Sequence, residues 1–176
     1  YGLETEAELK MLRVIKRLKE SSDATIKATF LGAHAVPLNF KNQPEQYLNY
    51  LLSDALPQIA AENLADYVDI FCESGYFTAK QTEKLIVASA KFGLKAKIHA
   101  NQFNSIGGIQ VAAKHNIVSV DHLEVMEDED FSALEKSSTI ATLLPLCSLF
   151  LNIPYAPAKK LNAKGIAIAL ASDYNP

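Results

Sequence analysis

Three residues whose side chains can bind a metal ion each follow a short apolar segment of β-strand character. His99 lies near the end of KAKIHA, His122 ends VSVDH, and Asp173 follows the apolar run IAIALAS. A carboxylate directly after a buried strand is costly to desolvate without a partner, and a metal ion is a common one. Imidazole nitrogen and carboxylate oxygen are expected donors for catalytic zinc or ferrous iron with an open position. We therefore predict one hydrolytic metal site that contains all three residues.

The segments around these residues predict a regular alternation of helices and strands. Apolar residues at helical spacing mark some segments, and β-branched runs bounded by glycine, proline or polar residues mark others. The expected helices are 4–19, 44–61, 78–92, 107–115, 128–136 and 158–164. The expected strands are 25–35, 67–73, 95–100, 117–123, 139–146 and 166–172. Strict alternation with few hairpin signals indicates an α/β fold built on a parallel sheet.

A doubly wound open sheet and a (β/α)₈ barrel both fit this alternation, and the polar residues favour the barrel. Polar side chains stand at the ends of five predicted strands: His34, Glu73, His99, His122 and Asp173. Barrels collect functional groups from many strand ends, whereas an open sheet concentrates its site at one switch point. Six βα units cannot close an eight-stranded barrel. Residues 1–176 are thus expected to form a partial catalytic barrel domain that lacks an N-terminal part.

For three further polar residues at or after strand ends, side-chain chemistry alone leaves two roles open. His34 is as suited to contacting substrate as to a structural role. Glu73 could orient a ligand histidine or lie solvated at the end of its strand. Gln102, on the loop after His99, could reach substrate or solvent, but its amide cannot act as a general base.

The remaining charged residues have simpler interpretations. Alternation along the strand is expected to direct Asp121 and Glu124 away from the direction that His122 faces, unless the geometry of the following loop reverses this. His115 is expected at a helix C-terminus, where a cation is favourable, and the acidic run at 127–130 is expected to begin a helix.

Composition and charge exclude several classes of partner. The net charge of −3 gives no electrostatic reason to expect nucleic acid or an anionic membrane. No apolar run reaches the roughly 18 residues that span a bilayer. The two cysteines, Cys72 and Cys147, lie in apolar strand-like runs and are expected to be buried packing thiols. Such cysteine usage favours a reducing compartment, and hence the cytoplasm.

Six segments, in order and spacing, resemble one family over essentially the whole chain. They are LGAHAVP, YVDIFCE, KIHANQFNSIGG, VDHLE, LLP and ALASDYNP. The resemblance is to imidazolonepropionase, of the metal-dependent amidohydrolase superfamily. It implies a distorted (β/α)₈ barrel with one zinc or iron ion, of which this chain holds strands three to eight. It also implies a homodimer that hydrolyses the small molecule 4-imidazolone-5-propanoate to N-formimidoyl-L-glutamate in histidine degradation.

The resemblance assigns separate duties to the three residues of the predicted metal site. His99 and Asp173 stand where the family has metal ligands. His122 stands where the family has a histidine that polarises the substrate carbonyl. Asp173 is also expected to move the proton of the attacking water.

The resemblance also assigns substrate contacts. Tyr1, His34 and Asn175 match a tyrosine, a histidine and an asparagine that bind substrate or product in the family. Gln102 occupies a position that varies between acid and amide. It is retained as a candidate catalytic and substrate-binding residue, but a water-activating carboxylate role does not transfer to it.

Two features of the family are missing from this sequence. The HxH metal pair that ends the first barrel strand is not present, and Arg13 and Arg17 are poor substitutes for a substrate-binding arginine. With about half of the ligands, this chain alone is expected to bind metal weakly and to be inactive. Two alternatives remain: a deaminase or cyclic amidase of the same superfamily, and a catalytically incompetent fragment.

Overall fold

A computed structural model describes Gly2 and residues 4–174, so the candidate residues Tyr1 and Asn175 lie outside the described residues. The chain divides into two compact units, which are described separately. The first consists of Tyr1–Phe71 and Lys80–Ala96, and the second of Cys72–Ala79 and Lys97–Pro176. One catalytic domain over residues 1–176 remains a prediction.

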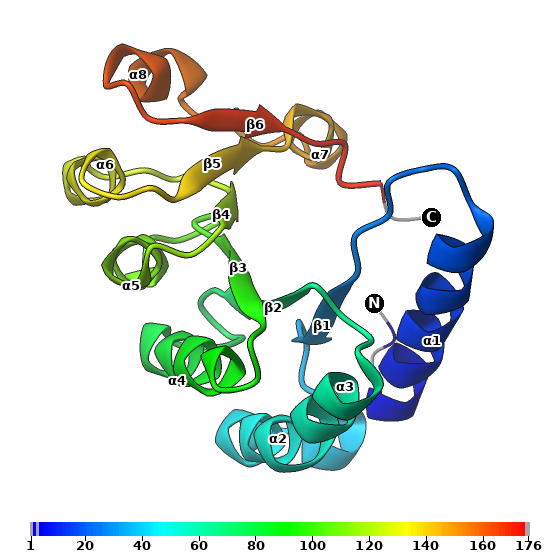
Figure 1. Cartoon of the computed structure of the whole chain (residues 1–176). Coiled ribbons are helices and arrows are strands. Elements are labelled where there is room, and N and C mark those ends of the chain that lie inside the picture. Colours follow the sequence, from blue (N-terminus) through cyan, green and yellow to red (C-terminus); the bar gives the residue numbers. More distant parts are fainter. Residues whose placement is uncertain (1, 3, 175–176) are drawn as a thin grey trace. The chain divides into compact units, whose positions relative to one another are not determined.

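The first unit contains two parallel strands, a helix that precedes them and the helices that follow each of them in the sequence (Figure 1). Strands β1 and β2 pair with Thr29 opposite Tyr67 and Phe30 opposite Val68. The elements are, in chain order, α1 (Thr5–Ser21), β1 (Thr29–Ala33), the 3₁₀ turn η1 (Leu38–Phe40), α2 (Pro44–Tyr50), the π turn η2 (Leu51–Ala55), α3 (Leu56–Glu62), β2 (Tyr67–Cys72) and α4 (Ala79–Ala90).

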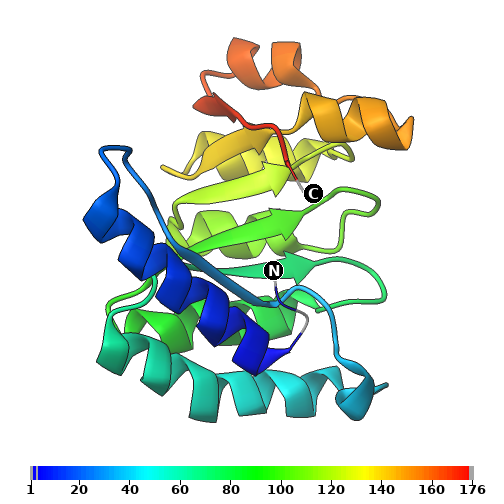
Figure 2. The same cartoon turned by 90° about the vertical axis from the view of Figure 1, so that its right-hand side faces the viewer.

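Helix α1 packs against β1, as Figure 2 shows. Its apolar stripe places Leu9 and Leu12 in the core, each about 1% exposed. Glu8 on the same face is also buried, and its carboxylate accepts a hydrogen bond from the backbone N–H of Leu31 at 3.2 Å. The helix predicted at 4–19 is thus confirmed, because its apolar spacing matches the face that the strand covers.

The helix predicted over 44–61 is one continuous helical run with a widened turn in its middle. In this turn the backbone N–H of Leu56 bonds to the carbonyl of Leu51, five residues earlier. Pro57 follows directly and has no N–H to donate, and its ring would press on the carbonyl of Ser53 in a regular α-helix. A π turn gives the ring room without ending the helix.

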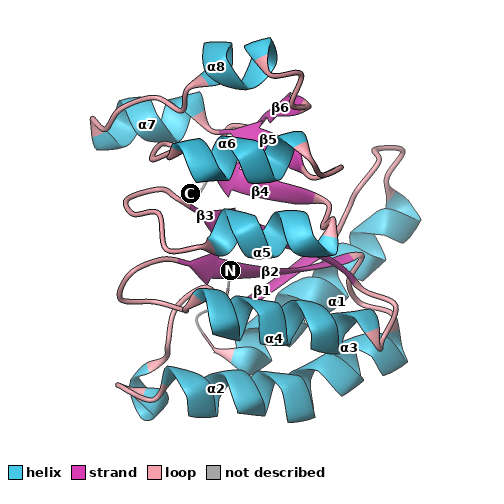
Figure 3. Ribbon diagram, turned by 90° about the vertical axis from the view of Figure 1, so that its left-hand side faces the viewer, coloured by secondary structure: helices cyan, strands magenta, loops and turns pink. Residues whose placement is uncertain are grey.

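The second unit is a parallel sheet in which strands β3 to β6 are neighbours in chain order (Figure 3). Helices α5 and α6 pack against each other beside the sheet. The elements are β3 (Lys95–Ala100), α5 (Gly108–His115), β4 (Ser119–His122), α6 (Asp128–Glu135), β5 (Ile140–Leu143), α7 (Pro145–Leu151), α8 (Ala158–Ala163) and β6 (Ile168–Leu170).

Helix α5 approaches its strand closely because it begins with glycine. A Cβ atom on Gly108 would lie 2.9 Å from Sγ of Cys72 and 3.0 Å from Cβ of Ala100. Overpacking of this kind costs about 1–3 kcal/mol, so Gly108 fits where a larger residue would not. The fully buried Ala100 therefore faces the helix. Lys97, three residues earlier in the same strand, forms an ion pair with Asp121 on the neighbouring strand, with Nζ 2.9 Å from Oδ2.

One predicted strand is partly wrong. The apolar run at 139–146 forms strand only to Leu143, and helix α7 begins at Pro145. Proline suits the first position of a helix, because its φ angle is already helical and its missing N–H has no partner there. Cys147 consequently lies in the first turn of a helix and not in a strand.

The other predicted strands and helices are present, although the strands at 25–35, 117–123 and 166–172 are shorter than expected. Within the described residues, no helix has both the length and the apolar character that a membrane span requires.

Candidate active site

The three predicted metal-site residues all belong to the second unit and follow its strands. His99 is the penultimate residue of β3, His122 is the last residue of β4, and Asp173 comes three residues after β6. The ring centroids of His99 and His122 are 5.3 Å apart, with the planes inclined by 54°. His122 is only 3% exposed, whereas His99 is half-buried and Asp173 is exposed. The structure thus brings the two histidines together at adjacent strand ends.

Backbone strain at the end of β4 turns the His122 ring out of the regular strand alternation. The register places His99 opposite Asp121, so a regular strand would direct His99 and His122 to opposite faces. His122 instead has a φ of 90° and Leu123 a φ of 66°. Asp173 also has a positive φ, of 52°. Such conformations are rare outside glycine and tend to cluster at functional sites.

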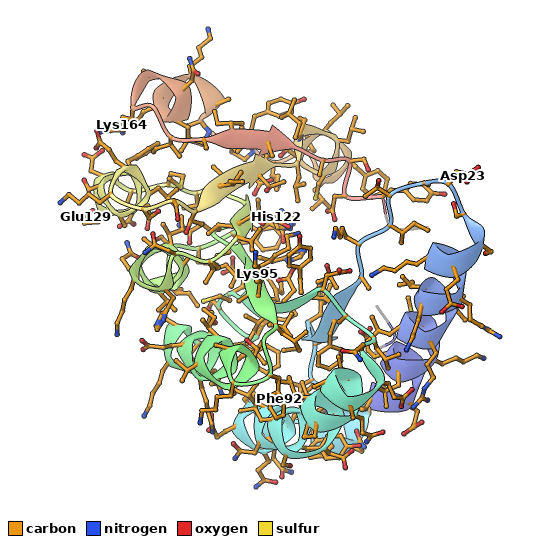
Figure 4. The ribbon with its side chains drawn as sticks, in the orientation of Figure 1. Asp23, Phe92, Lys95, His122, Glu129 and Lys164 are labelled. Carbon is orange, nitrogen blue, oxygen red and sulfur yellow. The ribbon has the colours of Figure 1, made fainter. Side chains whose placement is uncertain are left out.

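Figure 4 shows His122 on the side of β4 opposite helix α6. A donor atom of His122, the Sγ of Cys147 and a carboxylate oxygen of Asp173 all lie within 4.8 Å of one another. Nitrogen, sulfur and oxygen donors in this combination suit a divalent transition metal, zinc in particular. This cluster therefore fits a divalent metal ion; it contains Asp173 but not His99, the other ligand that the family resemblance implies.

Cys147 contacts this site, although the sequence pattern placed it elsewhere, as a buried residue of a strand. Nε2 of Gln102 donates a hydrogen bond to its Sγ at 3.7 Å, which also places Gln102 beside the cluster. Burial, and then the neighbouring carboxylates of Asp173 and Glu124, raise the pKa of the Cys147 thiol to about 12. The expectation of a buried packing thiol holds for Cys72 but is wrong for Cys147, which is half-buried on α7.

Glu124 is a second residue whose position the sequence did not predict. Its Oε2 lies 3.5 Å from Nδ1 of His122, and its Oε1 accepts a hydrogen bond from Oγ of Ser148 at 2.9 Å. The expectation that Glu124 points away from His122 is therefore wrong. Residues two apart share a face of a strand, and the positive φ angles of His122 and Leu123 bend the chain further.

Glu73 holds the loop that follows β3. Its carboxylate, only 2% exposed, accepts hydrogen bonds from the backbone N–H groups of Phe103 at 3.0 Å and Asn104 at 3.2 Å. Nδ2 of Asn104 and the backbone N–H of Ser74 donate to it as well. The alternative of a solvated strand end is thus wrong. Glu73 restrains the segment that carries Gln102.

Asp130 restrains the same loop from the other side and is completely buried. It accepts hydrogen bonds from Nδ2 of Asn101 at 2.9 Å, Oγ of Ser105 at 3.1 Å and Nε2 of Gln110 at 2.8 Å. It also accepts a hydrogen bond from the backbone N–H of Glu127, in a capping box that begins α6. The prediction that the acidic run at 127–130 begins a helix is confirmed. The hydrogen bonds of Asp130 to the loop were not predicted.

The other candidates fall outside this cluster. His34 follows β1 in the first unit, where it is half-buried and stacks on Phe71 with ring centroids 5.3 Å apart. His115 is the last residue of α5, as expected of a residue at a helix C-terminus. Tyr1 and Asn175 lie outside the described residues.

Imidazolonepropionases have sequences similar to that of this chain. The chain is 54% identical over all 176 residues to "Imidazolonepropionase" of Christiangramia forsetii and 56% identical to that of Flavobacterium johnsoniae. In both cases the match covers 100% of this chain and 43% of the relative, so the chain spans less than half the length of these relatives. No protein-family model matches the chain.

Solved structures with the same fold are more distant in sequence. A guanine deaminase from C. acetobutylicum, solved with guanine in its active site, has a TM-score of 0.72 at 14% identity, covering 98% of this chain and 44% of that one. An adenosine deaminase from Xanthomonas campestris, solved with bound zinc, has a TM-score of 0.59 at 9% identity, covering 91% and 39%. The fold is thus that of part of an amidohydrolase (β/α) barrel, and by sequence the chain belongs to the imidazolonepropionase family.

Proposed function

We propose that the protein to which this chain belongs is a metal-dependent hydrolase of histidine degradation. It opens the ring of 4-imidazolone-5-propanoate to give N-formimidoyl-L-glutamate. One observation carries the proposal: donor atoms of His122 and Asp173, from two separate strand ends, lie within 4.8 Å of one another and of Cys147. Identity of 54% to an imidazolonepropionase over the whole chain supports the choice of substrate. Because the chain spans 43% of that relative, the activity is assigned to the whole protein.

The metal ion of this proposal is zinc or iron, with His99 and Asp173 among its ligands. The donor set supports a transition metal, since imidazole and carboxylate groups at strand ends leave room for a substrate. When bound, the ion supplies Lewis acidity, which polarises a carbonyl group and makes water a stronger acid.

Asp173 transfers the proton, and His122 stabilises the negative charge that develops on the substrate. Water adds to the lactam carbonyl while Asp173 takes its proton, and the ring C–N bond then breaks as Asp173 delivers that proton to the departing nitrogen. His122, held beside the buried carboxylate of Glu124, donates a hydrogen bond to the carbonyl oxygen as negative charge develops there. The exposed position of Asp173 supports this role, because its carboxylate can reach solvent water.

The remaining candidate residues bind and orient the substrate. In this proposal Gln102 uses its amide to hydrogen-bond the substrate, and His34, with its ring stacked on Phe71, contacts the imidazolone ring. Tyr1 and Asn175 complete the substrate contacts. None of these four side chains is required to accept a proton.

The test uses the full-length protein and its Asp173→Asn variant. We expect turnover of imidazolone propionate to fall by about 10²–10⁴-fold, because general acid–base catalysis contributes that much. Circular dichroism should be unchanged, and Asp128→Asn, at an exposed carboxylate on α6, should retain full turnover. Near-normal turnover in Asp173→Asn would remove that residue from the mechanism. Deamination of guanine or adenosine, with no ring opening of imidazolone propionate, would overturn the proposed function.

The proposal extends to a cytoplasmic homodimer. Cys72 and Cys147 are not joined in a disulfide, which supports a reducing compartment. The family resemblance supports the dimer, and sedimentation of the full-length protein tests it: a monomer at micromolar concentration would contradict it.

A further inference from the structure

We propose that Cys147 is a ligand of the metal ion, so that the site combines sulfur with nitrogen and oxygen donors. The inference rests on the metal site of the proposed function, but it is independent of which substrate is hydrolysed. It goes beyond the ligand set that the family resemblance implies, since that set consists of histidine and aspartate. A thiolate ligand would favour thiophilic ions such as zinc, cobalt and cadmium over harder ions.

The first argument is geometric. Around a tetrahedral zinc ion, with Zn–S of about 2.3 Å and Zn–N or Zn–O of about 2.0–2.2 Å, neighbouring donor atoms lie about 3.3–3.7 Å apart. The Sγ of Cys147 and a carboxylate oxygen of Asp173, which is a ligand in the proposed function, already lie within 4.8 Å of each other. His122 lies in the same cluster but is not counted as a ligand, because its ring is assigned to the substrate carbonyl. The bound of 4.8 Å exceeds the donor separation by about 1.1–1.5 Å, so a bound ion would draw the thiol and the carboxylate closer together.

The second argument is the environment of the sulfur. Nε2 of Gln102 donates a hydrogen bond to Sγ at 3.7 Å, and such donors stabilise metal-bound thiolates and orient them. The neighbouring residue, Ser148, is buried and holds Glu124 beside His122. The helix turn that carries Cys147 is therefore tied by side-chain hydrogen bonds to the residues of the site.

The third argument is charge. The cluster places the carboxylate of Asp173 beside the thiol, together with the buried carboxylate of Glu124. A divalent cation between these groups compensates their negative charge, and binding displaces the thiol proton to solvent. The step balances as thiol plus M²⁺ giving a metal–thiolate bond and one released H⁺.

Cobalt substitution of the full-length protein tests the inference, and its readout does not depend on activity. With cobalt(II) replacing the native ion, we expect a thiolate-to-cobalt charge-transfer band in the near ultraviolet, in addition to the visible d–d bands. Cys147→Ser should lose the charge-transfer band and keep the d–d bands. Cys72→Ser is the matched control, because Cys72 is fully buried against the start of α5, and it should keep both.

The other outcomes separate this inference from the proposed function. Visible d–d bands without a charge-transfer band in the wild-type protein would overturn the ligand role of Cys147 and leave the metal site intact. A charge-transfer band that survives in Cys147→Ser would overturn it too, because the sulfur would then come from elsewhere. Absence of any cobalt spectrum would overturn both the inference and the metal site on which it rests.

Discussion

The carboxylate of Glu124 lies with its Oε2 3.5 Å from Nδ1 of His122, and both side chains are buried. Among the described residues, neither of these two atoms has a hydrogen-bond partner. A carboxylate at this distance from Nδ1 restrains the orientation of the imidazole ring and places negative charge beside it. Glu124 is therefore a positioning residue, which sets the orientation of the histidine assigned to the substrate carbonyl.

Replacing this carboxylate by an amide should lower turnover. In Glu124→Gln the side chain keeps its size, but the amide no longer places a negative charge beside the His122 ring. We expect kcat for imidazolone propionate to fall by roughly 10–100-fold with little change in KM, as for outer partners of catalytic histidines. Steady-state kinetics on the full-length protein measure both.

The matched control for this prediction is Ser148→Ala. It removes the hydrogen bond that Ser148 donates to the other oxygen of Glu124 but leaves the carboxylate in place. A smaller loss of kcat is expected. Equal losses in both variants would show that packing, and not the charge of Glu124, matters; unchanged kcat in Glu124→Gln would contradict its positioning role.

Local sequence signals were sufficient for most of the fold and for the strand-end residues. The strand Lys95–Ala100 has the predicted bounds, because a glycine precedes it and a polar loop follows its apolar residues. His99, His122 and Asp173 could be identified because each lies at or shortly after the end of such a strand. A polar residue after a buried strand is visible in a single segment, and parallel strands bring their ends to one edge.

Contacts that depend on tertiary packing were not predictable in this way. Cys147 comes from a helix that was interpreted as the end of a strand, although Pro145 is the signal that could have revealed it. Glu124 was wrongly directed away from His122, because residues two apart share a face of a strand. The positive φ angles of His122 and Leu123, which bend the chain there, leave no trace in the hydrophobic pattern. The buried role of Glu73 depends on a loop some 30 residues later in the chain.

Glu73→Gln should loosen the loop that follows β3. The amide group of glutamine cannot accept all the hydrogen bonds that Phe103, Asn104 and Ser74 now donate. Hydrogen bonds to a charged group contribute about 1.5–3 kcal/mol each, so we expect the backbone amides of Phe103 and Asn104 to exchange roughly 10–100-fold faster. Hydrogen exchange followed by NMR or mass spectrometry measures this. Glu129→Gln, at an exposed residue of α6 (Figure 4), is the control, and an unchanged rate in Glu73→Gln would contradict the restraint.

Asp66 should make the stability of the first unit depend on acid pH. Burial acts to raise the pKa of its carboxyl. Hydrogen bonds from Nζ of Lys19 at 2.5 Å and from the backbone N–H of Ala28 at 2.7 Å outweigh burial and hold that pKa below its ordinary value. The unfolded chain then binds the proton more readily, so stability falls as the pH drops through the native pKa.

Urea unfolding at about pH 5 and about pH 3 measures this dependence. The wild-type protein should lose more stability between the two values than Asp66→Asn, in which the titrating group is absent. An identical pH dependence in both proteins would show that Asp66 makes no such contribution.

Asp130→Asn should destabilise the protein, because this carboxylate joins the loop after β3 to the first turn of α6. It is completely buried and accepts hydrogen bonds from Asn101, Ser105 and Gln110 as well as from the backbone of Glu127. An amide at this position turns an N–H group towards donors, which leaves buried polar atoms unpaired. We expect the free energy of unfolding to fall by about 2–4 kcal/mol, measured by urea denaturation.

Asp128→Asn is the matched control for Asp130→Asn, because it changes the same functional group two residues earlier in the same helix. Asp128 is exposed and pairs only with Lys160 among the described residues, an ion pair that solvent screens. Its unfolding midpoint should remain that of the wild-type protein. If both variants unfolded at the same urea concentration, the hydrogen bonds of Asp130 would contribute no more than a surface charge, and the restraint on the loop would have to come from Glu73 alone.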